Sequence, residues 1–500
     1  MAENLWLITL CVALLGGILS GLPVMLVLAG VPVAVAALAA SMGAFDLVFL
    51  QAYPQRVFGV MGNGLLIAVP LFVLMGTLLE RSRLAERMLL SAAAAMGGSG
   101  RALALSVLLV STLVAASTGI IGATIVMLGL ISLPALLQAA VPARLASGLV
   151  CAAGTLGQII PPSIVLVLLG DQISNAYLDA QQAAGNFAPD PVTIGDLFAG
   201  ALVPGAMLVG LYALWVVWML PGAPVTRGGG RGSALRLLTD ILPPVLLIVA
   251  VLGAILAGVA TPTEAAAVGV AGALLLTAGA DAPRWRWVLA LGTAAGFSIV
   301  MLKLVGAAPV PVLVALTGLL LLGLASAAGL TLRSGALGAA FAQTVQVSAM
   351  IFGIILAASM LSLVFRGFGG DALVHELLTA LPGGPTGMLL ATLLVVFLLG
   401  FVLEFVEIVF ITVPIVGPVL LQHVDPVWFA VLLALNLQTS FLTPPFGFAL
   451  FYFRSVAPPE ITTAQIYRAI VPFVLIQLAA LALVLALPPL ATWLPSVLFG

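Results

Sequence analysis

Apolar segments long enough to cross a bilayer recur along the whole 500-residue chain. A transmembrane helix needs about 20 mainly apolar residues, and these stretches meet or nearly meet that length: 5–43, 60–80, 145–175, 198–220, 240–259, 265–280, 287–306, 309–327, 341–364, 427–453 and 466–488. The runs are continuous, whereas strands of a membrane barrel alternate. The pattern therefore predicts an all-α polytopic membrane protein. Stretch 5–43 is either one long kinked helix or two helices joined at Gly21-Leu22-Pro23.

Composition narrows the class of function. Charged residues make up 7% of the chain, against about 25% in soluble proteins. The net charge of −1 and the lack of a basic run argue against a nucleic-acid partner. Two histidines and two cysteines, in no metal-ligand spacing, give little support to a metal centre. A membrane-embedded enzyme is thus the weakest hypothesis, and we expect no catalytic residues.

The few charged residues orient the helices, because cytoplasmic loops are rich in Lys and Arg. Arg81, Arg83, Arg87 and Arg101 mark a cytoplasmic arm, and Arg227 marks a cytoplasmic loop. Segment 171–197 carries aspartates and no basic residue, so it is expected outside, where Arg56 and Arg366 also fall. This assignment of loops to the two sides of the membrane is consistent if stretches 103–138 and 387–421 each enter and leave the membrane on the same side, as re-entrant hairpins do. Ordinary pairs of spans would give the same result, so both interpretations stay open.

Two features recur in both halves of the chain. Leu128-Gly-Leu-Ile-Ser-Leu-Pro134 resembles Ile408-Val-Phe-Ile-Thr-Val-Pro414, and Gly154-Thr-Leu-Gly-Gln-Ile-Ile-Pro-Pro162 corresponds to Leu437-Gln-Thr-Ser-Phe-Leu-Thr-Pro-Pro445. Each half thus has an apolar hairpin followed by a helix that two prolines interrupt, because proline lacks a backbone donor. One hairpin opens from the cytoplasmic side and the other from outside. Inverted repeats with broken helices are typical of secondary transporters.

The two breaks are the candidate site. Freed carbonyl oxygens suit a cation such as sodium, and helix N-terminal ends suit a carboxylate. Polar side chains gather there, and we predict substrate binding by Ser117, Thr118, Thr155, Gln438 and Thr439. Alternatively, such hydroxyls bond to carbonyls of their own helix. Glu404 and Glu407, in the second hairpin, could bind a cation, take a proton or cap a helix.

The pattern predicts five parts. They are N-terminal scaffold helices 1–60, a first repeat 61–197, scaffold and connecting helices 198–340 with two extra spans, a second repeat 341–456, and a C-terminal helix 457–500. Each repeat comprises an arm, a hairpin (103–138 or 387–421) and a broken helix (145–175 or 427–453).

Motifs spread over nearly the whole chain resemble one family. They are Pro70-Leu-Phe-Val-Leu-Met-Gly76, Gly154 to Ser163, Ala260-Thr-Pro-Thr-Glu-Ala-Ala-Ala267, Asp425-Pro-Val-Trp-Phe429 and Leu442-Thr-Pro-Pro-Phe-Gly447. Together they resemble the large membrane subunit of tripartite ATP-independent periplasmic (TRAP) transporters. The resemblance implies an elevator mechanism, a sodium gradient as driving force, a small membrane subunit and a periplasmic substrate-binding protein. It also implies the bacterial inner membrane and an organic anion as substrate.

The resemblance also implies two sodium sites. The first would use Ser117, Thr118, Gly119, Gly157, Ile160 and Pro162, and the second Gly400, Glu404, Gln438, Thr439, Ser440 and Thr443. The chain departs from the common pattern at both hairpin tips, with Gly119-Ile120-Ile121 and Glu404-Phe405-Val406-Glu407. These departures resemble the branch associated with keto acids, lactate or chloroaromatic carboxylates. The alternative function is a proton-coupled or stand-alone organic anion transporter or exporter that works without a binding protein.

Overall fold

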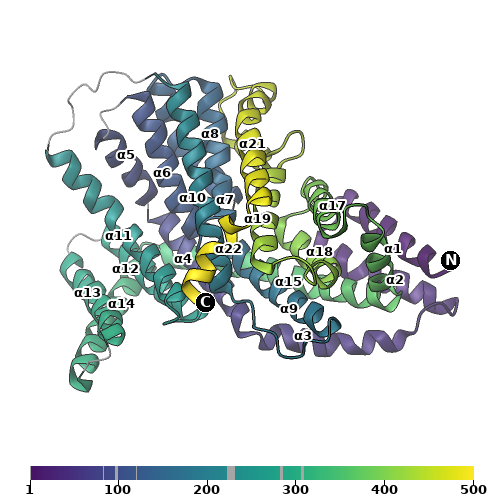
Figure 1. The fold of residues 1–500 in the computed structure, drawn as a ribbon. Helices are drawn as coiled ribbons and strands as arrows, with labels where there is room; N and C mark the ends of the chain where they lie inside the picture. Colours follow the sequence, from purple (N-terminus) through teal and green to yellow (C-terminus); the bar gives the residue numbers. More distant parts are fainter. Residues whose placement is uncertain are drawn as a thin grey trace.

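The computed structural model describes residues 2–82, 84–95, 99–119, 121–221, 231–281, 285–305 and 309–500, and every regular element in them is a helix (Figure 1). Nine of the described helices are long and apolar enough to cross a membrane. The prediction of an all-α polytopic membrane protein is therefore confirmed. Arg83 and Arg227, which helped to orient the loops, lie outside the described residues.

The N-terminal stretch forms two helices, which decides between the two interpretations of residues 5–43. Helix α1 (Ala2–Leu19) is followed by Gly21, whose φ of +78° is left-handed, and α2 (Val24–Ser41) begins after Pro23. Proline fixes φ and has no backbone donor, so it ends one helix and can precede the next. The short elements η1 (Leu47–Ala52) and α3 (Tyr53–Gly62) follow.

The first repeat contains an arm, a helical hairpin and a broken helix. Its elements are η2 (Gly64–Ile67), α4 (Ala68–Arg81), α5 (Leu84–Ala95), α6 (Gly100–Thr118), α7 (Ile121–Gln138), α8 (Ala143–Thr155), η3 (Leu156–Gln158) and α9 (Ile164–Ala183). The helices α10 (Ile194–Met219), α11 (Arg231–Leu256), α12 (Pro262–Asp281), α13 (Arg286–Val305) and α14 (Val310–Arg333) come next.

The second repeat has the same order of elements. It comprises α15 (Ala336–Gly367), α16 (Gly370–Thr379), α17 (Gly384–Leu399), α18 (Phe405–Leu420), α19 (Pro426–Leu442) and α20 (Phe448–Val456). The chain then ends with α21 (Thr463–Ala486) and α22 (Pro489–Phe499). The structure thus has two C-terminal helices where the sequence predicts one, because Pro488 and Pro489 interrupt the backbone hydrogen bonding. The division into five domains stays a prediction.

Each hairpin packs against the broken helix of the other repeat. In the first hairpin α7 packs on α20 of the second repeat, and in the second hairpin α18 packs on α9 of the first repeat. Both contacts are close: a Cβ on Gly129 would lie 2.6 Å from Val456, and a Cβ on Gly417 would lie 2.7 Å from Ala176. The second helix of each hairpin thus packs on the second half of the other repeat's broken helix, as the internal repeat in the sequence leads one to expect.

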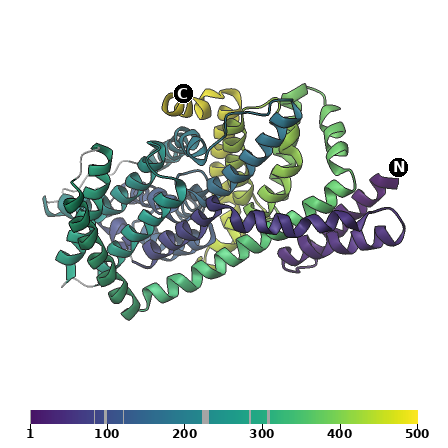
Figure 2. The same ribbon diagram turned by 90° about the horizontal axis from the view of Figure 1, so that it is seen from below.

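Helix α15 connects the ends of the molecule. It runs from the α13–α14 pair to α1 and α2 (Figure 2), and on the way it contacts α4 and α18. The α13–α14 pair, at the lower left of Figure 1, covers the stretches 287–306 and 309–327 that the sequence predicts as two extra spans. Of the two, α14 is among the helices long and apolar enough to cross a membrane. Its helices approach closely at Gly292 and Gly323, where a Cβ on either glycine would lie within about 3.0 Å of the other's Cα. Small residues allow such close packing of membrane helices.

Candidate functional site

The tip of the first hairpin lies on the break of the first repeat. Helix α6 ends at Gly119, whose φ of +60° is left-handed and so favours glycine. A Cβ on Gly119 would lie 3.2 Å from the backbone N of Ile164, the first residue of α9. Gly157, in the break, faces the tip, because its Cβ would lie 3.0 Å from the carbonyl oxygen of Ala115. Ile120 and the side chains of Ser117 and Thr118 lie outside the described part of the chain.

The tip of the second hairpin lies on the second broken helix in a similar way. A Cβ on Gly400 would overlap the side chain of Ser440, and the Ser440 hydroxyl donates to the carbonyl oxygen of Phe397 at 2.6 Å. One turn earlier, Asn436 Nδ2 donates to the carbonyl oxygen of Leu393 at 2.7 Å. Two polar side chains thus attach α19 to α17.

Glu407 caps the helix that leaves the second tip. Its carboxylate accepts a hydrogen bond of 2.9 Å from the backbone N of Glu404, the residue before α18. A negative charge at a helix N-terminal end is favourable. The two residues form a reciprocal capping box, so the structure supports the capping interpretation for both. Glu404 also lines a cavity described below.

The hydroxyls at the breaks bond mainly to their own helices. Thr155 donates to Ala152, Thr439 to Leu435 and Thr443 to Thr439, all to carbonyl oxygens at 2.7–2.8 Å. The alternative of own-helix hydrogen bonds is therefore the one observed for these three residues. A hydroxyl that donates in this way keeps its acceptor lone pairs, so cation binding by these oxygens stays open.

Four buried polar side chains connect the two breaks with α10 and α21. Gln438 Nε2 and Gln477 Nε2 approach Thr155 Oγ1 at 3.3 and 3.4 Å, and Gln477 Nε2 also donates to the Tyr212 hydroxyl at 2.8 Å. All four residues are at most 1% exposed. We call this set the central polar network. Thr155 and Gln438 occupy corresponding positions in the two repeats, so the network lies where the repeats meet.

A cavity of about 90 Å³ lies where the two hairpin tips, α15 and α20 meet. The first hairpin contributes Gly119, Ile121 and Gly122, and the second contributes Glu404, Phe405 and Val406. Helix α15 contributes Val347, Met350 and Ile351. The remaining described lining residues are Ile164, Phe441, Phe448 and Tyr452. We call it the tip cavity.

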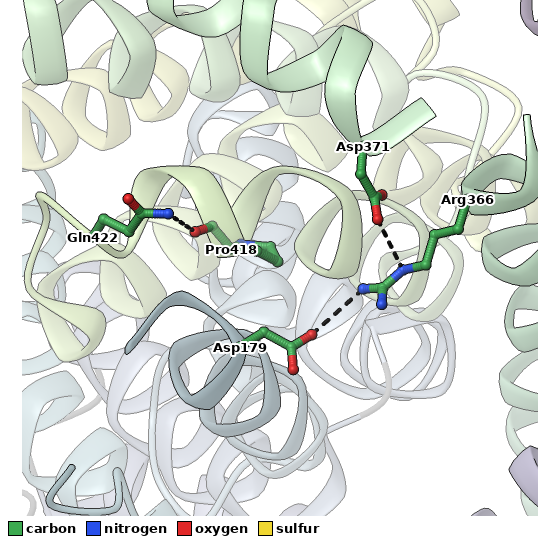
Figure 3. Close-up of polar contacts among 5 residues, drawn as sticks. All are labelled: Asp179, Arg366, Asp371, Pro418 and Gln422. Carbon is green, nitrogen blue, oxygen red and sulfur yellow. Dashed lines mark hydrogen bonds and ion pairs between the residues drawn. The ribbon is translucent and has the colours of Figure 1, made fainter. Parts of the chain in front are cut away.

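An ionic cluster joins the end of α15 to the end of α9 (Figure 3). Arg366 lies 3.4 Å from both Asp179 and Asp371. Burial lowers the pKa of the nearby Arg56 guanidinium, Arg366 lowers it further, and the two aspartates oppose the shift. The sequence predicted Arg56, Arg366 and segment 171–197 on the same side of the membrane, and the structure brings these groups together.

The family model described as "Tripartite ATP-independent periplasmic transporter, DctM component" matches residues 10–490. The chain belongs to this family. The family is one of membrane permeases, so this TRAP large permease subunit is a membrane protein and its relatives are transporters rather than enzymes. The predicted resemblance is confirmed, whereas the keto acid branch is not tested by the match.

Characterised relatives align over most of the chain. The C4-dicarboxylate TRAP transporter large permease protein DctM of Vibrio cholerae is 26% identical and covers 95% of this chain and 96% of its own length. The sialic acid TRAP transporter large permease protein SiaM of the same species is 26% identical over 89% of this chain and 90% of its own. The ectoine TRAP transporter large permease protein TeaC of Halomonas elongata is 24% identical over 95% and 97%.

A solved structure supports the fold alone. The YdaH transporter of Alcanivorax borkumensis superposes with a TM-score of 0.56 at 15% sequence identity, and the match covers 87% of each chain. The predicted transporter fold, with inverted repeats, two hairpins and two broken helices, is confirmed on these grounds.

The structure brings only some of the predicted site residues of this TRAP subunit together. Gly119 meets Gly157, and Gly400 meets Ser440. The predicted substrate ligands Thr155, Gln438 and Thr439 do not line the tip cavity. The Ile160 side chain packs beside Gly205 of α10. Pro162 follows Pro161 through a cis peptide bond, as Pro445 follows Pro444. Both sodium sites stay predictions.

Several residues that complete the site have partners that the sequence does not predict. Gln477 and Tyr212 join the central polar network, and Val347 and Tyr452 line the tip cavity. Gln477 carried a usable signal, because an amide in an otherwise apolar helix is costly without a partner. Val347 carried none, since it is one apolar residue among many in α15.

Proposed function

We propose that this chain is the permease of a sodium-coupled importer of a small organic anion in a bacterial inner membrane. A periplasmic binding protein would deliver the carboxylate, and a small membrane subunit would brace the scaffold. The observation that carries the proposal is that each hairpin tip rests on a helix broken within its own repeat. Broken helices of this kind hold ions and anionic substrates in secondary transporters.

Cation binding at the breaks needs no acidic cluster. Irregular backbone between Gln158 and Ile164, and between Leu442 and Phe448, leaves carbonyl oxygens without helical partners. Threonine hydroxyl oxygens beside them can also accept or coordinate. Neutral oxygens suit a weakly bound monovalent ion that must be released at each cycle.

Transport would follow an elevator mechanism in this proposal. The hairpins and broken helices form one connected unit, because each tip contacts its own repeat and each hairpin contacts the other repeat. A unit whose hairpins and broken helices contact one another within and between the repeats can move as a rigid body against the helices outside it.

The proposal is tested by uptake into proteoliposomes that contain this chain with its small subunit. We expect uptake only with a sodium gradient and with the binding protein outside. Thr439→Ala should raise the sodium concentration needed for half-maximal uptake, while Thr9→Ala in α1, far from the breaks in sequence, should leave it unchanged. Uptake that is indifferent to sodium and to the binding protein would refute the proposal.

Proton coupling is the alternative, and the position of Glu404 beside the tip cavity favours it. A carboxylate in an apolar environment can exchange a proton as well as attract a cation. Uptake driven by a pH gradient without sodium, and lost in Glu404→Gln, would favour this alternative. The resemblance to the keto acid branch suggests a monocarboxylate as the transported anion.

A further inference from the structure

Helix α9, the second half of the first broken helix, makes two polar contacts with elements outside the hairpins and broken helices. Asp171 Oδ1 accepts a hydrogen bond of 2.7 Å from Asn63 Nδ2, just before η2. Asp179 lies 3.4 Å from Arg366 at the end of α15 (Figure 3). The two aspartates are eight positions apart, or about 12 Å along a helix. We call these the Asn63 contact and the Arg366 contact.

Asn63 is fixed to helices other than α9. Its Oδ1 accepts a hydrogen bond of 3.0 Å from the backbone N of Leu65 and so caps η2. The carbonyl oxygen of the next residue, Gly64, accepts a hydrogen bond of 2.9 Å from the Thr263 hydroxyl in α12. Helix α12 packs along α4, and α4 in turn packs on α15. Asn63 therefore belongs to one body with α4, α12 and α15.

Arg366 is anchored to that body as well. Two positions further on, Phe368 is 4% exposed and packs on Trp6 and Phe45, with ring centroids 6.3 and 4.7 Å apart. These aromatic contacts attach the end of α15 to α1 and to the segment after α2. Both partners of α9 are thus held in place by contacts that do not involve α9.

The two contacts differ in their environment. Asp171 is 5% exposed, and its second donor among the described residues is Gln172 of its own helix, at 2.9 Å. A buried carboxylate that loses a donor is strongly disfavoured. The side chains of Arg366 and Asp179 are 35% and 51% exposed, so water and salt screen their attraction. The Asn63 contact therefore supplies most of the energy.

Resting on the proposed elevator movement, we infer that the Asn63 and Arg366 contacts form a latch that holds the moving unit in the described position and breaks in every transport cycle. A slide of α9 past α15 would take Asp179 from Arg366 and Asp171 from Asn63, because the partners stay with the fixed helices. Contacts present in one of two states set the balance between those states. A covalent latch should therefore stop transport.

Cross-linking tests the latch in proteoliposomes that contain this chain with its small subunit. Asn63→Cys with Asp171→Cys is bridged by Hg²⁺, which is small enough for a buried pair of thiols. Asp179→Cys with Arg366→Cys is bridged by o-phenylenedimaleimide, because these positions are partly exposed. We expect either bridge to abolish uptake of the substrate, and excess thiol to restore it after Hg²⁺. Uptake that continues at the unbridged rate would overturn the latch.

The matched control bridges two fixed helices. A Cβ on Gly269 of α12 would lie 2.5 Å from the Met75 sulfur of α4, so Met75→Cys with Gly269→Cys places two thiols together within one body. Its Hg²⁺ bridge should leave uptake unchanged. All pairs are made in a Cys11→Ala, Cys151→Ala background, because both native cysteines are free thiols. If the control pair cross-links and neither latch pair does, the contacts are not populated and the latch is refuted.

An exchange of side chains tests the latch without a bridge across it. Asn63→Asp keeps an oxygen to cap η2 but places a second carboxylate against Asp171. The described position should then be less populated, so the dimaleimide should bridge Asp179→Cys and Arg366→Cys about tenfold more slowly. Adding Asp171→Asn should restore the rate, because the new amide at position 171 can donate to the new carboxylate at position 63. An unchanged rate in Asn63→Asp, or no recovery in the double exchange, would contradict the latch.

Failure of the latch and failure of the proposed function give different results. Uptake that needs sodium and the binding protein, yet persists in the bridged complex, refutes the latch and leaves the proposed function standing. Uptake that is indifferent to sodium and to the binding protein refutes the proposed function. The rate of bridging between positions 179 and 366 needs no transport, so it still decides whether the latch exists.

Discussion

The central polar network makes a prediction about stability that depends on no assumption about transport. Gln477 donates to the Tyr212 hydroxyl at 2.8 Å and approaches Thr155 Oγ1 at 3.4 Å, and all three residues are fully buried. In Gln477→Leu these buried oxygens lose a donor, which costs about 1–3 kcal/mol. Gln477 Oε1 is buried without a hydrogen-bond partner among the described residues. Because the substitution by leucine also removes this unpaired oxygen, part of the loss is offset and the low end of the range applies.

A double-mutant cycle isolates the hydrogen bond to Tyr212. Tyr212→Phe removes only the hydroxyl, so once it is gone Gln477→Leu has less to lose. Measured couplings of this type in a membrane protein average about 0.6 kcal/mol and reach about 1.7 kcal/mol. We therefore expect the double variant to be less destabilised than the sum of the single variants by about that amount.

The assay is equilibrium unfolding of the purified subunit in mixed micelles, with the free energy of unfolding of all four proteins compared. The matched control pairs Gln477→Leu with Tyr467→Phe, a tyrosine on the same helix whose hydroxyl donates to Pro445. Ten residues of α-helix separate the two positions by about 15 Å, so these changes should be additive. Additivity in the Tyr212 cycle as well would refute the hydrogen bond as an energetic link.

Three further predictions concern the tips and the ionic cluster. In Gly119→Ala the alanine must adopt the left-handed conformation of the tip, which costs about 1–2 kcal/mol, so half-maximal uptake should need roughly 5- to 30-fold more sodium. An unchanged dependence of uptake on sodium would exclude the tip from the sodium site. Gly400→Ala should abolish uptake because the new methyl group overlaps Ser440, and adding Ser440→Gly should restore part of it, whereas no recovery would contradict this steric cause. Arg366→Gln should destabilise the subunit by about 1 kcal/mol at most, because its ion pairs with Asp179 and Asp371 are 35–53% exposed; a loss of stability that persists in high salt would contradict this.

The sequence was most informative where proline or glycine interrupts a helix. The breaks at Pro161-Pro162 and Pro444-Pro445, and the hinge at Gly21 to Pro23, follow from the chemistry of those residues alone. The division at Pro488 followed the same rule, yet the length of the apolar stretch suggested one helix.

The site itself could not be assembled from the sequence, because its walls come from distant segments. The tip cavity joins residues near positions 120, 350, 405 and 450, and no local pattern specifies that these meet. The same holds for the central polar network, where Thr155 and Gln477 are 322 positions apart. The internal repeat predicted which residues correspond to each other, but correspondence under an inverted symmetry does not specify contact.

The packing of each hairpin on the other repeat bears on how this architecture originated. Helix α7 packs on α20 as well as on α8 of its own repeat, and α18 packs on α9, so each hairpin contacts both halves of the chain. In a half-length ancestor, the contacts of α7 with α20 and of α18 with α9 would have joined two antiparallel copies of the chain. Gene fusion would then have converted contacts between subunits into contacts within one chain, and each half would have become free to diverge in sequence.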